Sequence, residues 1–312
     1  MLEGDGYNDG AWAEAGLRAC PLQTNIEVTQ LDINDVTIMQ RDNSVRATFN
    51  YTLDDGTIPE AYFYDPPPGT VIKMPGNDPH EMQIIDGWSR ANTFSLDREG
   101  FALKEFHSAF DRFDDDDAVR DQFYPTVAEF VRTSVGARRV SVFDHTIRSK
   151  VNVQQQTAEH TTTQRAPVMI VHCDYTPTSG PLRVRQLMLD EADELLKRRV
   201  AFYNFWKPLK RRVEEKPLAM CDVTSASQGD MLKMLLRYRD RTGEIFVMRH
   251  SSAHRWWYFP KMTPEDALLL KTYESETDGR ARFLGHSAFE DPNTSPDAPV
   301  RESIEIRTMA FF

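Results

Sequence analysis

The chain has 312 residues, of which 40% are hydrophobic, and a formal net charge of −11. This length allows one large core or two modest ones, and all-β sandwiches and barrels often reach this size as a single domain. Such an acidic protein is poorly suited to wrapping a phosphate backbone, so no nucleic-acid partner is expected. The local basic cluster at residues 207–212 is interpreted as a solvated loop.

Cysteine usage and the N-terminal sequence exclude further classes. Cys20, Cys173 and Cys221 lie far apart, so they predict neither a disulfide framework nor a CxxC zinc site. Residues 1–6 are acidic and lack the basic segment and apolar run of a secretory signal. No apolar stretch approaches the roughly 18 residues that a membrane helix needs. The sequence therefore predicts a cytoplasmic protein without a membrane partner.

The first part of the chain predicts strands followed by a helix. Residues 36–64 contain short alternating runs broken by clusters of Asp, Gly and Pro, which are typical of strands and turns. Three phenylalanines at helical spacing then predict a helix over residues 104–135. Four consecutive aspartates at 114–117 interrupt it, and they lack the interleaved spacing of a calcium loop. They predict an acidic loop between helices.

The second part predicts mainly strands. Residues 150–166, rich in Gln and Thr, predict a mobile loop. The run at 168–171 predicts a short buried strand, and helical spacing predicts a helix from 190 to about 200. Further strands are predicted at 140–143, 201–206, 217–220, 245–248, 255–259, 267–270 and 303–307. A helix that begins at Pro264 stays open as an alternative for one of these.

Many short strands with few helices predict a mainly β fold with flanking helices (α+β), built on a double-stranded β-helix, or jelly-roll, core of the cupin type. We expect residues 1–312 to form one domain. In it, the strands and helices of residues 1–139 pack on a jelly-roll core of residues 140–312.

His172 and Asp174 directly follow the strand predicted at 168–171. In an extended chain, residues i and i+2 project to the same side, so both side chains can reach one ion. Mononuclear ferrous oxygenases use two histidines and one carboxylate, which leaves positions for a cosubstrate and dioxygen. With 8 histidines and 48 acidic residues, roughly one His-x-Asp or His-x-Glu arises by chance, and one is present. The motif alone is therefore weak evidence for a metal site, and neighbouring sequence features have to support it.

A histidine and an arginine downstream provide that support. His286 supplies a third ligand, and Arg301 and Ser303 lie two positions apart on a predicted strand, so they face the same side. A guanidinium can hold the distal carboxylate of 2-oxoglutarate through two hydrogen bonds, and a hydroxyl can add a third. The sequence thus predicts a catalytic Fe(II) site of His172, Asp174 and His286, with 2-oxoglutarate bound by Arg301 and Ser303.

His254 competes with His286 for the third position. His250 and His254 are four residues apart and could meet on one face of a helix, but the Glu of a zinc-protease helix is missing between them. The aromatic run at 256–259 instead favours a strand, and His254 stays open as the alternative ligand. Further candidates for the substrate pocket, with core packing or a surface ion pair as the competing interpretation, are Arg148, Tyr175, Tyr203, Trp206 and Phe289.

Seven blocks of sequence resemble a known family in the same order. They are Val171–Tyr175, Tyr203–Leu209, Pro217–Asp222, His254–Pro260, Leu270–Ser275, His286–Pro292 and Arg301–Arg307. With them the chain, from about Phe94 to its C-terminus, resembles the non-haem iron oxygenase family of the CmcJ, NvfI and AsaB-type proteins. The resemblance implies a jelly-roll fold, Fe(II), 2-oxoglutarate and O2, and the same five site residues.

Three positions depart from the pattern of that family. Lys207 stands where Arg is expected, Glu274 where Asp is expected, and Leu284-Gly285 where Thr-Pro is common. A lysine at 207 would make a point contact with a carboxylate, where an arginine would make a bidentate one. None of the three departures removes a candidate iron ligand.

The activity that the resemblance implies is oxidation of a small molecule of specialised metabolism, coupled to decarboxylation of 2-oxoglutarate to succinate. Hydroxylation, desaturation, epoxidation and oxidative cyclisation all stay open, as do a monomer and a homodimer. Two other classes are weighed: an accessory or binding protein on the same fold, and a methyltransferase. The second lacks a Gly-rich strand–turn–helix fingerprint.

Overall fold

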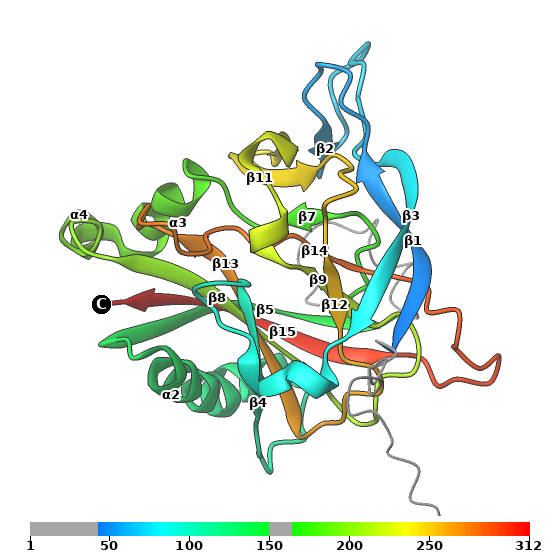
Figure 1. Cartoon of the computed structure of the whole chain (residues 1–312). Helices are drawn as coiled ribbons and strands as arrows, with labels where there is room; N and C mark the ends of the chain where they lie inside the picture. The colour runs from blue at the N-terminus through cyan, green and yellow to red at the C-terminus, as the bar shows by residue number, and fades with distance from the viewer. Residues whose placement is uncertain (1–42, 150–163) are drawn as a thin grey trace, which may run out of the picture. The chain divides into compact units, whose positions relative to one another are not determined.

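The computed structural model describes residues 43–149 and 164–312, which belong to one compact unit, Asp42–Phe312. The strand predicted near residue 36 and most of the loop predicted at 150–166 lie outside the described residues. In the described part, the strands form one sheet of nine and one of six (Figure 1). The apolar cluster that includes Trp206, Met220, Trp257 and Leu268 draws side chains from both sheets. The two sheets therefore share a core.

The nine-stranded sheet carries β7 and β14 as neighbours near its middle. These two short strands are antiparallel, and they place His172 directly opposite His286. In spatial order, the strands of the sheet are β1 (Ser44–Thr52), β3 (Asn77–Asp86), β12 (Trp256–Tyr258), β9 (Leu218–Cys221), β14 (His286–Ala288), β7 (His172–Cys173), β11 (Thr242–Met248), β10 (Met231–Arg237) and β2 (Glu60–Tyr62).

The six-stranded sheet has β8 and β15 at its centre. In spatial order, its strands are β4 (Phe101–Glu105), β13 (Asp266–Glu274), β8 (Val200–Pro208), β15 (Glu302–Phe311), β5 (Arg139–Ser149) and β6 (Gln164–Arg165). Strands from before and after residue 140 are thus members of both sheets. A division into residues 1–139 and a core of 140–312 stays a prediction.

The two faces of β8 have different neighbours because side chains alternate along a strand. Asn204 and Trp206 point to one face, and Phe205 and Lys207 point to the other. Trp206 packs with Met220 of β9, so its face lies toward the nine-stranded sheet. Phe205 shares a cluster with apolar side chains of α2 (Tyr124–Val135), which lies outside the six-stranded sheet (Figure 1). The first face lines the interior of the fold, and the second lies under the helix layer.

The helices of the described chain are short. None of them is long and apolar enough to cross a membrane. Besides α2, they are α1 (Asp116–Ala118), α3 (Ser179–Met188), α4 (Ala192–Leu195), a π-helix (Val119–Phe123) and 3-10 turns at Trp88–Thr93, Leu189–Glu191, Val223–Ser225 and Gln228–Asp230.

The helix predicted over residues 104–135 is wrong in its first third. Strand β4 runs to Glu105, and no helix begins between β4 and α1. The phenylalanines whose spacing suggested a helix meet Phe123 in an irregular loop instead. Phe110 stacks on Phe123 with ring centroids 5.1 Å apart, and Phe113 meets the same ring edge-on. Aromatic packing in a loop therefore mimics a helical stripe in the sequence.

Other boundaries also differ from the predictions. The helix predicted at 190–200 is the single turn α4, because Val200 already begins β8, and α3 was not predicted. The strand predicted at 168–171 forms one bridge, at Ile170, and the regular strand begins at His172. No helix begins at Pro264, since β13 starts at Asp266. The remaining strands predicted after residue 139 coincide with β5, β8, β9, β11, β12, β13 and β15.

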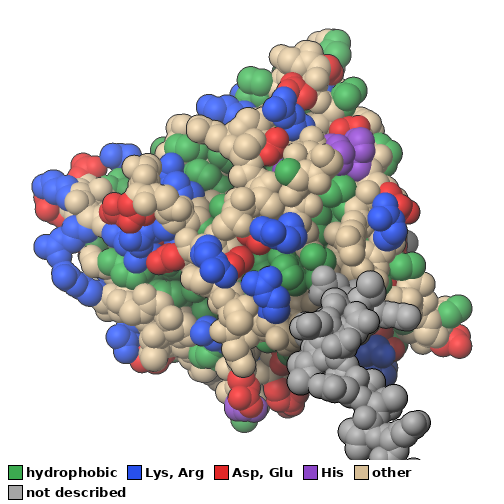
Figure 2. All heavy atoms as spheres, viewed as in Figure 1, with side chains coloured by type: hydrophobic (Ala, Val, Ile, Leu, Met, Phe, Trp, Pro, Cys, Tyr) green, Lys and Arg blue, Asp and Glu red, His purple; other side chains and the backbone are tan. Residues whose placement is uncertain are grey.

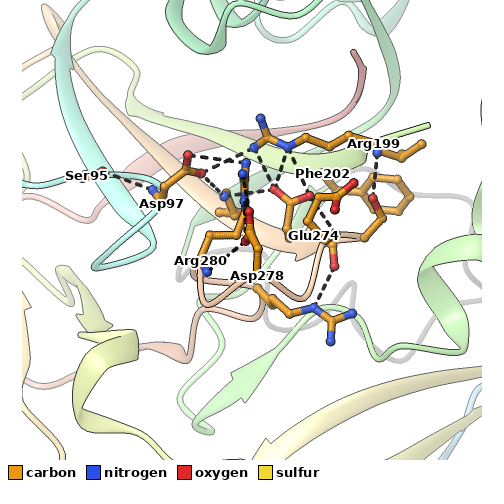
Figure 3. Close-up of polar contacts among 12 residues, drawn as sticks. Ser95, Asp97, Arg199, Phe202, Glu274, Asp278 and Arg280 are labelled. Carbon is orange, nitrogen blue, oxygen red and sulfur yellow. Dashed lines mark hydrogen bonds and ion pairs between the residues drawn. The ribbon is translucent and has the colours of Figure 1, made fainter.

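A buried cluster of charged side chains ties β13 to its surroundings (Figure 3). The side chains of Lys271 and Glu274 are wholly buried, with Nζ and Oε2 3.1 Å apart. Arg199 donates three hydrogen bonds of 2.8–3.2 Å to the same carboxylate, and Lys271 also pairs with Asp97. The backbone N–H of Leu284 donates to the carbonyl of Lys271, which anchors the segment that leads into β14.

Candidate metal centre

His172, Asp174 and His286 place three ligand atoms within 4.8 Å of one another, the only such group in residues 43–149 and 164–312. The two imidazoles come from paired strands, with ring centroids 4.4 Å apart. The Asp174 carboxylate lies 3.8 Å from His172 Nε2 and 4.0 Å from His286 Nε2. The structure thus brings together the three residues predicted as ligands.

Both histidines are held in the form that binds a metal. His172 Nδ1 donates to the carbonyl of Ile170 at 2.8 Å, and His286 Nδ1 donates to the carbonyl of Leu284 at 3.0 Å. A carbonyl only accepts, so each Nδ1 carries the proton and each Nε2 has a free lone pair. Burial and the neighbouring His286 hold the pKa of His172 well below its usual value, which keeps this imidazole neutral.

The separations suit a single ion. Two ligand atoms on one ion, with bonds of about 2.1 Å, stand no more than about 4.2 Å apart. The distance of 3.8 Å from Asp174 Oδ1 to His172 Nε2 falls within that limit, and His286 Nε2 lies 4.0 Å from the other carboxylate oxygen, Oδ2. Two neutral imidazoles and one carboxylate are also the ligand set that Fe(II) takes in mononuclear oxygenases.

The Asp174 carboxylate is oriented from the opposite sheet. Asn204 Nδ2 on β8 donates a hydrogen bond of 2.6 Å to Asp174 Oδ2 and lies 3.4 Å from Glu305 Oε1. Glu305 is paired with Arg307. Although burial opposes its ionisation, Arg307 and Arg148 lower the pKa of Glu305 to about 2, so it is a carboxylate at neutral pH. Asn204 thereby occupies one oxygen of Asp174 and leaves the other for a metal.

These supporting residues were not predicted as part of the site, although the sequence carries a signal. Asn204 is a lone amide in the buried strand Val200–Pro208. On β15, Glu305 and Arg307 alternate with apolar residues. They continue the every-second-residue spacing of Arg301 and Ser303, so the four side chains face the same side. Polar side chains at every second position of a buried strand must face a shared polar interior, because each needs a partner there.

Arg301 and Ser303 lie on the interior side and are incompletely hydrogen-bonded. Arg301 Nε and Ser303 Oγ are both buried and have no hydrogen-bond partner in the described chain. Arg301 donates from Nη1 to the carbonyl of Lys216, and its guanidinium lies 5.8 Å from the ring centroid of Trp206. Burial lowers the pKa of Arg301 to about 9, so the group is still charged at neutral pH. A buried cation and hydroxyl with unmet donors fit a carboxylate ligand.

Arg301 and both triad histidines line one cavity together with Arg148 and Trp206. Its volume is about 20 Å³, room for about one water molecule, so a dicarboxylate can enter only when side chains move. Arg148 and Trp206 therefore lie at the site, as predicted for pocket residues. The other three candidates pack in apolar clusters: Tyr175 beside Phe202, Tyr203 under the helix layer and Phe289 beside Phe49.

His254 lies apart from this group. Its Nδ1 is 3.0 Å from the hydroxyl of Tyr51, and its Nε2 is 3.3 Å from Asp230 Oδ2. Trp256 donates to the same hydroxyl at 2.8 Å. Both ring nitrogens of His254 therefore have protein partners, and it is His286 that stands beside His172.

Comparison with known proteins gives the same picture. A family described as "Oxidoreductase/YMDC permease-like domain" matches residues 48–311. The hydroxylase/desaturase efuI of Hormonema carpetanum is 32% identical over 291 residues, which cover 86% of this chain and 95% of that protein. The Fe(II)/2-oxoglutarate-dependent dioxygenase nvfI of Aspergillus novofumigatus is 29% identical over 83% of this chain and 93% of its own length. The chain belongs to this family of Fe(II)/2-oxoglutarate-dependent oxygenases.

The solved structures agree. One structure of the iron and alpha-ketoglutarate-dependent endoperoxidase NvfI, in a different conformation, matches with a TM-score of 0.76 at 26% identity, over 86% of this chain and 98% of that one. The predicted jelly-roll fold is confirmed, as are the oxygenase class and the requirement for Fe(II), 2-oxoglutarate and O2. The catalytic interpretation is favoured over an accessory protein.

The hydrogen bond from Asn204 to Asp174 leads to a prediction. We expect Asn204→Ala to weaken Fe(II) binding by about 10- to 100-fold, the usual effect of losing a partner that orients a ligand. Chelator competition on the apo-protein measures this affinity without any turnover. Tyr203→Phe, on the same strand but its opposite face, is the matched control and should bind Fe(II) like the wild type. Equal affinity in Asn204→Ala and the wild type would contradict an orienting role.

Proposed function

We propose that His172, Asp174 and His286 bind the Fe(II) of this oxygenase. Arg301 and Ser303 bind the distal carboxylate of 2-oxoglutarate. The observation that carries the proposal is the convergence of two histidine Nε2 atoms and a carboxylate within 4.8 Å. It is supported by the neighbouring Arg301 and Ser303, whose buried Nε and Oγ atoms have no hydrogen-bond partner in the described chain.

When bound, Fe(II), 2-oxoglutarate and O2 supply the oxidation of a C–H bond, coupled to decarboxylation of 2-oxoglutarate to succinate. The protein's own residues place the reactants and exclude water. The carbonyl-bound Nδ1–H groups fix both imidazole tautomers, and Asn204 fixes the carboxylate of Asp174. Arg301 offers a desolvated positive charge, which attracts a carboxylate more strongly in this buried position than in water.

The substrate that we propose is a small molecule of specialised metabolism, oxidised by hydroxylation, desaturation or oxidative cyclisation. This range rests on the relatives, because efuI is named a hydroxylase/desaturase and NvfI an endoperoxidase. One site can support these outcomes, since the position of the substrate relative to the oxidant decides which bond forms.

We further propose that the enzyme acts in the cytoplasm, without a nucleic-acid partner, and we retain a homodimer as its candidate assembly. The net charge of −11 supports the absence of nucleic acid. On the face shown in Figure 2, basic and acidic side chains are interspersed and no broad basic surface appears. Light scattering on the purified protein tests the homodimer.

An anaerobic titration tests the cosubstrate role. With Fe(II) bound, 2-oxoglutarate is expected to produce a weak visible charge-transfer band that saturates in the wild type. Arg301→Gln should need roughly 10-fold or more higher 2-oxoglutarate concentration for half saturation, because a charge-assisted hydrogen-bond donor is lost. Ser303→Ala should shift the midpoint in the same direction by less.

The Fe(II) content of both variants is the control, since neither residue is a proposed ligand. Unchanged Fe(II) affinity with weaker 2-oxoglutarate binding supports the assignment. The assignment of Arg301 is overturned if Arg301→Gln saturates at the wild-type concentration. Absence of the band in iron-loaded wild type would instead contradict the whole site.

A further inference from the structure

A second cavity lies on the face of the six-stranded sheet that points away from the metal centre. Its volume is about 720 Å³, and its walls come from the loop after β4, the end of β8 and the turn before β13. Three of its side chains are Phe106, Phe110 and Phe113, in the segment whose predicted helix is absent. Lys207 also lines it, on the opposite face of β8 from Asn204 and Trp206.

The side chain of Lys207 is largely buried, and its ammonium group has no polar partner in the described chain. The residue is only 4% exposed, and its Nζ has no hydrogen bond or ion pair in the described chain. Burial lowers the pKa of its ammonium group, with Glu265 acting in the opposite direction. Buried lysines are otherwise found paired, because the desolvation of an unpaired charge is costly.

Packing alone accounts poorly for this arrangement. Lys207 Nζ lies 5.7 Å from the ring centroid of Phe106 and 5.9 Å from that of Phe113. Both distances are close to the limit of about 6 Å for a useful cation–π contact. Glu265 lines the same cavity, but it is exposed and makes no ion pair with Lys207 among the described residues. The ammonium group therefore keeps hydrogen-bonding capacity beside a cavity large enough for a ligand.

We propose that this cavity binds a small organic anion with a flat apolar body and a single carboxylate. The carboxylate pairs with Lys207, and the phenylalanine wall packs on the body of the ligand. Lys210 lies at the exposed rim and adds a second positive charge, whereas Asp111 and Glu265 at the same rim disfavour a second carboxylate on the ligand. The chemistry differs from that of 2-oxoglutarate, which has two carboxylates and no apolar body.

Calorimetric titration of the full chain with phenylacetate tests the proposal. We expect saturable binding to the wild type, at least about tenfold weaker binding to Lys207→Met, and near wild-type binding to Lys207→Arg. Phenylacetamide, which has the same ring without the charge, should bind as weakly to the wild type as phenylacetate binds to Lys207→Met. Arg301→Gln should bind phenylacetate like the wild type, because that arginine lies on the other face of the sheet.

Folding of Lys207→Met is verified by its Fe(II) affinity and thermal unfolding, and its Tm is expected to equal or exceed that of the wild type, since an unpaired buried charge is removed. Equal phenylacetate affinity in the wild type and Lys207→Met overturns the proposal. So does absence of saturable binding to the wild type. Loss of binding in Arg301→Gln with retention in Lys207→Met would place the carboxylate at the metal centre instead, and would equally overturn it.

Discussion

Replacing His286 by alanine is expected to lower Fe(II) affinity and the decarboxylation of 2-oxoglutarate by at least about 100-fold, whereas His254→Ala should retain both. A lost partner of a ligand already costs 10- to 100-fold, so a lost ligand should cost more. The two histidines are a matched pair. Both are buried, both belong to sequence blocks that resemble the family, and the sequence leaves either one open as the third ligand.

Their surroundings explain the different outcomes. His286 faces His172 across paired strands and directs its free Nε2 toward Asp174. His254 uses one nitrogen toward Tyr51 and the other toward Asp230. Its removal takes one hydrogen-bond partner from each of those groups, which keep Trp256 and Ser227 as partners. The loss costs stability of about 1–3 kcal/mol but removes no metal ligand.

Three measurements separate the loss of a metal ligand from the loss of stability: metal content after Fe(II) loading, succinate formed per enzyme, and Tm. The expected pattern is a lower Tm with full iron in His254→Ala, and little iron in His286→Ala. The reverse pattern, with iron lost only in His254→Ala, would contradict the assigned triad while leaving the oxygenase class intact.

The ligand motif was predictable because its geometry is local. His172 and Asp174 are two residues apart, and the alternation of an extended chain puts both on one side whatever the rest of the fold does. Local sequence could not decide between His286 and His254 as the third ligand. The choice depends on β14, a strand of three residues, pairing with β7, and neither strand is long enough to show a pattern of its own.

The same distinction explains the errors in the predicted fold. Long alternating or continuously apolar runs became β8, β13 and β15. Phe106, Phe110 and Phe113 carry a helical spacing, but contacts with Phe123 hold them in a loop. Asn204 stood in a block that resembles the family, yet its role needs Asp174, which is 30 residues away and belongs to the other side of the interior. Tertiary pairing decides such cases, and spacing alone does not report it.

Glu274→Gln is expected to destabilise the enzyme by up to about 3–5 kcal/mol, because it removes the wholly buried carboxylate beside the Lys271 ammonium and leaves only the half-exposed Asp97 as its partner. Arg199 would lose the same partner. In a protein of this size the expected fall in Tm is up to roughly 5–8 °C, measurable by calorimetry. Glu274→Asp keeps the negative charge at this position, where the family resemblance led us to expect Asp, and it should cost clearly less.

Two further variants separate the removal of a charge from the breaking of a pair. Asp278→Asn removes an exposed partner of Arg280 in the same group of residues (Figure 3) and should leave Tm near the wild-type value. The double variant Lys271→Met with Glu274→Leu removes both buried charges and should be more stable than Glu274→Gln alone. If Glu274→Gln and Asp278→Asn lower Tm equally, the buried pair contributes no more to stability than the exposed pair. The anchor of the segment that carries His286 would then have to be the backbone hydrogen bond between Leu284 and Lys271.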